Sequence, residues 1–201
     1  MLKTVFSLAT AAAITTLSTA ILSTSAIADE WTLNSGQSKI AFGSVKSEEI
    51  GEAHHFTNLS GQVGADGTAT VAIDVSSLET WIDIRNERML EHVFNAVSFP
   101  VAKIEAQIDM AAVEKLQPGD TAILSTEGML SIVGSDVEID AELFVIVISD
   151  SKVMVTTDEM IMLATEDLGI TAGIDKLMAL ADLPSITRVT PVTLRLIFDK
   201  G

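Results

Sequence analysis

Histidine and acidic side chains crowd one short segment of the chain, and groups of this kind can bind a metal ion. The segment contains the acids Glu48, Glu49 and Glu52 and the histidines His54 and His55, and His92 lies further along. Without cysteine, the ligands would be imidazole and carboxylate groups. Neighbouring residues of a strand point to opposite faces, so only one of the two adjacent histidines can join such a site. The sequence favours the alternative, a polar loop at the mouth of a barrel that binds no metal.

Two arginines, Arg85 and Arg88, lie three residues apart and could hold one ligand together. A guanidinium fork binds a phosphate or a carbonyl head group through paired hydrogen bonds. Surface ion pairs with Asp83, Glu87 or Glu91 would account for the same arginines without any ligand. The sequence leaves both interpretations open.

The motifs of common enzyme classes are missing from the sequence. The chain has no cysteine and no Gly-x-Ser-x-Gly turn that would present a nucleophilic serine. The glycine run at Gly61, Gly64 and Gly67 lacks the lysine of a phosphate-binding loop and falls in a predicted hairpin. We therefore expect a protein that is not an enzyme, with no catalytic residue and no resident cofactor.

The formal net charge of the 201-residue chain is −16, which disfavours polyanionic partners. A strongly acidic protein repels phosphate backbones and anionic lipid surfaces unless basic residues cluster locally. The sequence contains no run of Lys or Arg that would form such a cluster. Nucleic acid is therefore not expected as a partner.

The first 28 residues have the features of a cleaved signal peptide. Lys3 precedes an apolar stretch from Val5 to Leu22, and the segment ends in the small-residue pattern Ala26-Ile27-Ala28. Cleavage would leave one domain over residues 29–201. We expect export to a bacterial periplasm, and since the chain has no cysteine for lipidation, no stable membrane anchor.

Most of the chain alternates apolar and polar residues with a period of two, which predicts strands. Lys103, Glu105 and Gln107 separate the apolar residues Ala102, Ile104, Ala106 and Ile108, and the segment around Val137 to Leu143 alternates with acids in the same way. We predict about eight strands, near residues 31–34, 38–47, 57–63, 68–75, 99–109, 121–133, 136–149 and 152–159, and a further strand near 191–199. Tight turns between them predict antiparallel neighbours. The fold class is all-β, an antiparallel barrel or sandwich.

Two short helices interrupt this pattern. Met89, Leu90, Val93 and Phe94 have helical spacing within residues 86–94, with Asn86 or Asp83 as a candidate cap. A second apolar stripe predicts a helix from Ile174 to Ala181, which Pro184 ends. Residues 111–116 are ambiguous.

The predicted strand at Leu143 to Ile148 is apolar on both faces. One face would pack on the interior, and the other would lie under a helix or against a second subunit. A homodimer is therefore one expected partner arrangement. Because an eight-stranded barrel is just wide enough either to be filled by side chains or to hold one small ligand, the state of the interior stays open.

Several motifs in order along the chain resemble the YceI-like family, the lipocalin-like, polyisoprenoid-binding periplasmic proteins. They include Trp31-Thr32-Leu33, Ser38 to Phe42, Leu59-Ser60-Gly61, Ser77 to Thr80, Arg85 to Leu90, Phe99-Pro100 and Gly128 to Gly134. The chain departs from the usual family pattern after the second strand, where Lys46 leads into the acidic segment and the two histidines.

The resemblance implies a lipocalin-like barrel whose apolar interior holds an isoprenoid chain, such as a polyprenyl lipid or an isoprenoid quinone, for carriage or sequestration. The alternative is a metal-binding or stress-related structural or interaction protein with a filled barrel. Carried over by motif position, the expected ligand-binding residues are Phe42, Met89, Leu90, Phe94, Phe99, Leu130 and Ile132, with Arg85 and Arg88 for the head group.

Overall fold

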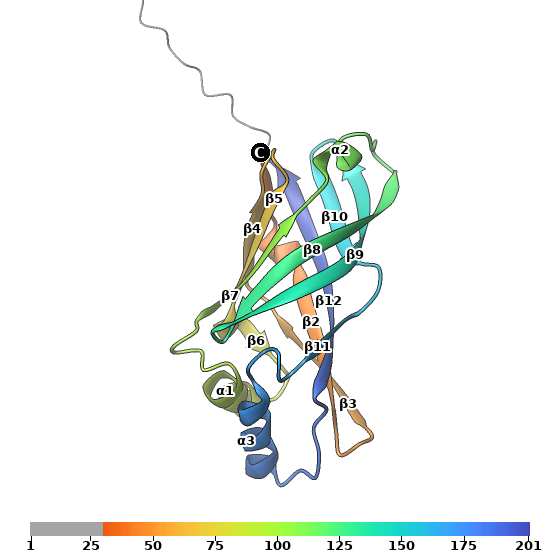
Figure 1. The fold of residues 1–201 in the computed structure, drawn as a ribbon. Coiled ribbons are helices and arrows are strands. Elements are labelled where there is room, and N and C mark those ends of the chain that lie inside the picture. Colours follow the sequence, from red (N-terminus) through yellow and green to blue (C-terminus); the bar gives the residue numbers. More distant parts are fainter. Residues whose placement is uncertain (1–29) are drawn as a thin grey trace, which may run out of the picture.

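Residues 30–201 form an antiparallel β-barrel with short helices packed against one end in the computed structural model (Figure 1). These are the residues that the structure describes, and the expected signal peptide, residues 1–28, lies outside them. Eight strands follow one another around a closed ring, because β1 pairs both with β4 and with the last strand, β12. The predicted all-β antiparallel barrel of about eight strands is therefore confirmed.

The ring strands alternate inward apolar and outward polar residues, as their sequences predict. In β9, for example, Val137 and Ile139 pack against the core while Glu138 and Asp140 are exposed. In ring order the strands are β1 (Trp31–Leu33), β4 (Leu59–Val63), β5 (Thr68–Asp74), β7 (Val101–Gln107), β8 (Thr121–Ile132), β9 (Ser135–Ser149), β10 (Lys152–Thr157) and β12 (Val189–Lys200).

Four further strands extend the sheet beyond one end of the ring. They are β2 (Lys39–Lys46), β3 (Ile50–Phe56), β6 (Leu78–Glu79) and β11 (Ile161–Ala164). The first half of β12 pairs with β11 on one edge and with β2 on the other, and β3 and β6 continue outward from β2. The second half of β12 pairs with β10 and β1 and so closes the ring.

Strand β3 replaces the polar loop that we expected around the histidines. Ser47 and Glu48 both adopt positive φ, at 51° and 66°, and this tight turn folds β3 back onto β2. Turns of this kind are usually signalled by Asn-Gly or Asp-Gly, because those residues tolerate positive φ. Ser-Glu gives no such signal, which is why the sequence predicted a loop here.

The two predicted helices lie side by side at the lower end of the barrel in Figure 1. Helix α1 (Asp83–Arg88) continues into η3 (Met89–Val93), a π-helical turn in which the Phe94 amide donates to the Met89 carbonyl at 2.9 Å. Helix α3 (Thr171–Ala181) begins three residues before the predicted start.

The remaining helical segments are short. Helix α2 (Met110–Val113) settles the ambiguous segment, and the carboxylate of Asp109 caps it. The 3₁₀ turns η1 (Ser35–Gln37) and η2 (Val75–Ser77) connect strands. No helix within residues 30–201 has the length and the apolar character needed to cross a membrane.

The doubly apolar part of β9 has both backbone edges paired within the chain, to β8 and to β10. Its inward residues, Val145 and Val147, are buried, whereas Ile148 on the outer face is 49% exposed. A second subunit could therefore contact only the outer face of β9 and could not extend the sheet at this strand. Dimerisation stays a prediction.

Gly173 allows α3 to pack directly on the backbone of η3. A Cβ atom at this position would lie 2.3 Å from the His92 carbonyl oxygen and 2.6 Å from Val93 Cα. Alanine in a helix is favoured over glycine by about 1 kcal/mol, but forcing a methyl group against fixed backbone costs about 1–3 kcal/mol. We predict that Gly173→Ala lowers the free energy of unfolding by up to about 2 kcal/mol, measured by urea denaturation.

The matched control is Gly51→Ala, because a Cβ atom at Gly51 meets no atom within 4 Å. We expect its stability to stay within about 0.5 kcal/mol of the parent protein. A Gly173→Ala protein as stable as Gly51→Ala would show that the two helices can separate without cost.

Candidate functional site

An apolar cavity of about 400 Å³ lies between the lower part of the barrel and the helices α1, η3 and α3. Strands β2, β8 and β12 contribute inward-facing side chains, and the helices close the opposite side. This volume falls in the range of roughly 300–1,000 Å³ that is typical of small-molecule pockets. The residues that contribute its apolar wall include Phe42, Phe56, Met89, Phe94, Leu130, Ile132, Leu163, Ile170, Ile174, Leu177, Val192 and Leu194.

A second apolar chamber of about 140 Å³ continues the interior toward α2. Ile104, Ile139, Ile161 and Leu194 line both chambers and form the wall between them. None of the described residues that line the second chamber is classed as exposed. The barrel is therefore not filled by its own side chains, and its interior reaches the surface from the first chamber.

Three phenylalanines give the first chamber a rigid aromatic wall. Phe42 from β2 stacks on Phe56 from β3 with 5.6 Å between ring centroids, and Phe94 meets Phe56 edge-to-face at 5.7 Å. Edge-to-face and offset arrangements are the favourable geometries for aromatic pairs. This contact fixes η3, which Phe94 directly follows, against the sheet.

The structure brings seven of the nine expected ligand-binding residues to the first chamber. They are Phe42, Arg85, Arg88, Met89, Phe94, Leu130 and Ile132. The other two are not among the residues that line it: Leu90 packs against the core beside the cavity, and Phe99 lies in a turn beside Gly134. These seven residues therefore line one cavity. That they bind a ligand stays a prediction.

Sequence reasoning missed much of the wall that α3 and β12 supply. Ile174 and Leu177 belong to one apolar helical stripe. Val192 and Leu194 lie two residues apart, the spacing of the inward face of a strand. These patterns predict burial, but they do not reveal that the buried faces leave a space between them.

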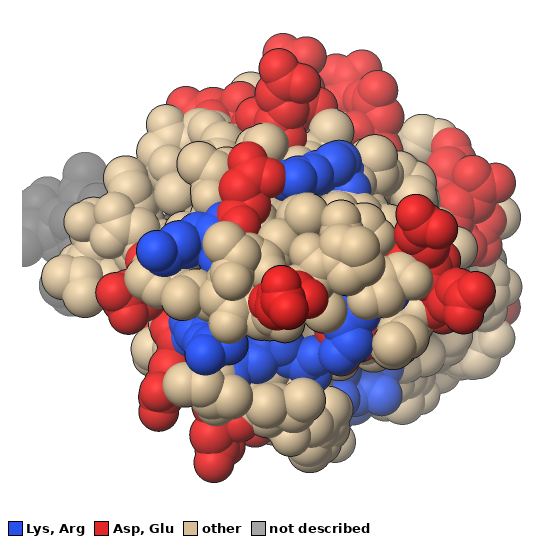
Figure 2. All heavy atoms as spheres, turned by 90° about the horizontal axis from the view of Figure 1, so that it is seen from below, with Lys and Arg blue, Asp and Glu red and all other residues tan. Residues whose placement is uncertain are grey.

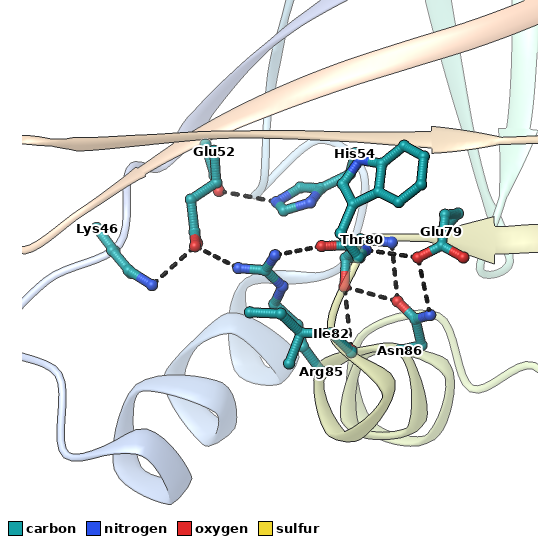
Figure 3. Close-up of polar contacts among 10 residues, drawn as sticks. Lys46, Glu52, His54, Glu79, Thr80, Ile82, Arg85 and Asn86 are labelled. Carbon is teal, nitrogen blue, oxygen red and sulfur yellow. Dashed lines mark hydrogen bonds and ion pairs between the residues drawn. The ribbon is translucent and has the colours of Figure 1, made fainter.

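Polar groups gather at the open end of the first chamber (Figure 3). Glu52 from β3 accepts a hydrogen bond from Lys46 Nζ at 2.7 Å and pairs with the guanidinium of Arg85 from α1. Partial burial acts to raise the pKa of Glu52, but hydrogen bonds from Lys46 and Arg85 outweigh it and lower that pKa. Arg85 is therefore paired with Glu52 and not with Asp83, Glu87 or Glu91, its neighbours in sequence.

The motif Thr-x-x-x-x-Arg-Asn places Arg85 at this end. The Asn86 side-chain oxygen accepts hydrogen bonds from the Thr80 amide at 2.9 Å and from the Thr80 hydroxyl at 2.6 Å. The Arg85 guanidinium also donates to the Thr80 carbonyl. Neither expected cap residue, Asn86 or Asp83, caps the helix, because Ile82 occupies the N-cap position and no side chain bonds there. Asn86 instead closes the turn that leads into the helix.

His54 is buried in the chamber wall, with 3% of its surface exposed. Its Nε2 lies 3.2 Å from the Ser44 hydroxyl, whereas its Nδ1 and the Nε of Arg85 are buried without a hydrogen-bond partner among the described residues. Burial, together with the nearby positive charge of Arg85, lowers the pKa of His54 to about 4. His54 is therefore neutral at pH 7.

His55 lies on the opposite face of β3, as strand geometry predicts, and its ring packs 5.5 Å from that of Trp81. Within residues 30–201, no group of three or more His, Cys, Asp or Glu residues is arranged to hold a metal ion. The two histidines thus lie on opposite faces of β3 and contact different residues.

The fold assembles a local basic cluster that the sequence did not indicate. Figure 2 shows this end of the molecule, where Lys and Arg side chains lie close together with acidic side chains among and around them. Lys46, Arg85 and Arg88 all line the open chamber, and Arg88 makes no hydrogen bond or ion pair within the described residues. The expectation that the chain lacks a basic cluster is therefore wrong, because tertiary contacts join two distant segments.

The chain matches the family model for the YceI-like domain over residues 31–194. It is similar to the solved structure of a polyisoprenoid-binding domain from Saccharophagus degradans implicated in plant cell wall breakdown, with 31% identity, a TM-score of 0.83, and 85% of this chain and 98% of that chain covered. BcnA from Burkholderia cenocepacia shares the fold, at 17% identity and a TM-score of 0.64, with 82% of this chain and 98% of that chain covered. No curated protein matches the chain.

The buried neutral His54 predicts acid sensitivity of the fold. Its pKa is lower in the folded state than in the unfolded chain, so as the pH falls below about 6.5 the unfolded chain takes up the proton first. We expect the free energy of unfolding to fall by about 2 kcal/mol between pH 7 and pH 5 from this residue alone, measured by urea denaturation.

Replacement of His54 by leucine should remove most of this pH dependence. His92→Asn is the matched control and should retain it, because His92 lies outside the chamber wall. Equal pH dependence in the His54→Leu variant and the parent protein would contradict this prediction.

Proposed function

Because this chain belongs to the YceI-like family, we propose that it is a non-enzymatic lipid-binding protein that holds an isoprenoid chain, part of a polyprenyl lipid or quinone, inside the barrel. The observation that carries the proposal is an apolar cavity that continues into a second chamber and opens at a polar mouth. The polyisoprenoid-binding domain from Saccharophagus degradans, similar over most of its length, supports the choice of ligand class. Its role would be that of a carrier or sequestering protein.

Burial of the chain would supply the affinity. Each buried CH₂-sized group contributes about 0.8 kcal/mol, so one five-carbon isoprene unit contributes about 4 kcal/mol before the costs of ordering. A few units in contact with the aliphatic and aromatic wall are enough for micromolar binding or better. The wall requires no specific polar contact along the chain, which suits a repetitive hydrocarbon.

The head group would lie at the polar mouth. Arg88 has no partner within the described residues, and the unpartnered Nε of Arg85 and Nδ1 of His54 lie nearby in the same wall. A buried polar atom without a hydrogen bond is costly, so a ligand oxygen that reaches one of them would gain stability. A phosphate or a quinone carbonyl provides such an oxygen.

Export to the periplasm is the second part of the proposal, and it rests on the signal-like pattern of residues 1–28. We predict that the protein recovered from the periplasmic fraction of its host begins at Asp29 when sequenced from its N-terminus. Recovery of a chain that still begins at Met1 in the cytoplasm would contradict this location.

Protein purified from its host should release a long-chain isoprenoid on extraction with organic solvent, detected by mass spectrometry. Ligand-free protein should take up an added polyprenyl lipid. A protein that is reproducibly empty and also fails to take up the lipid would reject the proposal.

A pair of variants on β12 tests whether the cavity is the binding site. Val192 lines the first chamber, whereas Val189 is 44% exposed outside it. Val192→Trp should fill part of the chamber and lower the amount of retained lipid at least tenfold, because the indole occupies space that the chain needs. Val189→Trp adds the same indole outside and should leave retention unchanged; equal retention by both variants would place the lipid elsewhere.

A further inference from the structure

The apolar wall of the first chamber continues onto the outer surface at the mouth. Ile82 and Ile84 both line the chamber, yet they are 45% and 51% exposed. Trp81, which precedes them, is also exposed, but its ring packs against His55 on the face of β3 away from the chamber. Large apolar side chains that are exposed together and continuous with a cavity usually mark an interaction site.

Hydrogen bonds fix the backbone of the turn that precedes these two isoleucines. The fully buried Thr80 is fixed by Asn86 and Arg85, and the Trp81 amide donates to the carboxylate of Glu79. Trp81 also adopts a positive φ of 65°, which is unfavourable for a bulky residue and persists only where its surroundings impose it. The exposure of this turn is thus built into the fold, and the turn is not a loose loop.

Cationic side chains line the same opening. Lys46 and Arg85 share the single carboxylate of Glu52, and Arg88 adds a further unpaired charge within the described residues. The exposed acids Asp83 and Glu87 of α1 accompany them. At physiological salt, charges beyond about 8 Å are largely screened, so the acids on the rest of the barrel act only weakly here. The mouth combines exposed apolar groups with cations that have acidic side chains among and around them (Figure 2).

We infer that this end of the protein, the mouth surface formed by Ile82, Ile84, Lys46, Arg85 and Arg88, docks on the surface of a phospholipid bilayer. Apolar side chains of an interfacial site insert at the boundary between head groups and acyl chains. Arginine and lysine extend beside them to lipid phosphates. In this orientation the chamber opens directly onto the acyl region.

A second copy of the chain is a less suitable occupant. A symmetric contact between two mouths would set Lys46, Arg85 and Arg88 of one copy against the same residues of the other. Like charges brought together across an interface oppose association. The phosphates of a bilayer offer the opposite charge, and its acyl chains accept the isoleucines.

Flotation with vesicles tests the inference separately from cavity occupancy. Vesicles of phosphatidylcholine with one-third phosphatidylglycerol contain no isoprenoid, so binding to them does not depend on the proposed ligand. The parent protein should float with these vesicles, less so at high salt. The Ile82→Ser, Ile84→Ser double variant should bind at least fivefold more weakly, and Arg88→Gln should weaken binding without changing any apolar contact.

The matched control is the Ile123→Ser, Ile148→Ser double variant. These isoleucines are exposed to a similar extent, 53% and 49%, on the outer face of β8 and β9, away from the mouth. The control should bind vesicles like the parent protein. Loss of binding in the control to the same extent, or no flotation of the parent protein, would overturn the inference.

A dimer in light scattering that becomes a monomer in the Ile82→Ser, Ile84→Ser variant would show that the surface serves self-association, which would also overturn the inference.

Discussion

Pairing of β12 along both edges is the constraint on which the rest of the structure depends. Its second half joins β10 to β1 and closes the ring, while its first half holds β11 and β2 apart. Because β2 and β3 join the ring strands through this first half, the sheet flares at one end and does not close there on itself. The opening must be covered by other elements, and α1, η3 and α3 cover it.

The helices that cover the opening do not fill the space beneath them, and this space is the cavity. Gly173 lets α3 approach η3 to backbone contact, so the two helices act as one unit over the opening. Phe94 attaches that unit to the sheet through Phe42 and Phe56. The aliphatic and aromatic side chains beneath do not fill the barrel, which leaves two chambers with largely apolar walls. An interior of this kind favours a flexible hydrocarbon over a rigid polar ligand.

The mouth combines two requirements that usually conflict. An opening into an apolar interior must tolerate water at its edge, and here one carboxylate, Glu52, satisfies two cations that would otherwise be partly buried. Removal of one partner from such a group is costly, because a charge is then left unpaired. The same hydrogen bonds that anchor Arg85 also set the turn at Thr80, so the polar contacts and the exposed apolar side chains of the mouth are fixed together.

The sequence by itself determined the elements with regular periodicity and the family. Alternation in β7 and β9 and the helical spacing of Met89 and Phe94 depend on local geometry, which a sequence expresses directly. Only the tertiary structure decided what depends on distant contacts. The β2–β3 hairpin turns at residues that do not favour positive φ, the ion pair joins Glu52 to Arg85 across 33 positions, and the basic mouth gathers residues from two segments. A cavity forms where the buried faces of several elements do not fit together completely. The sequence of one element therefore cannot specify it.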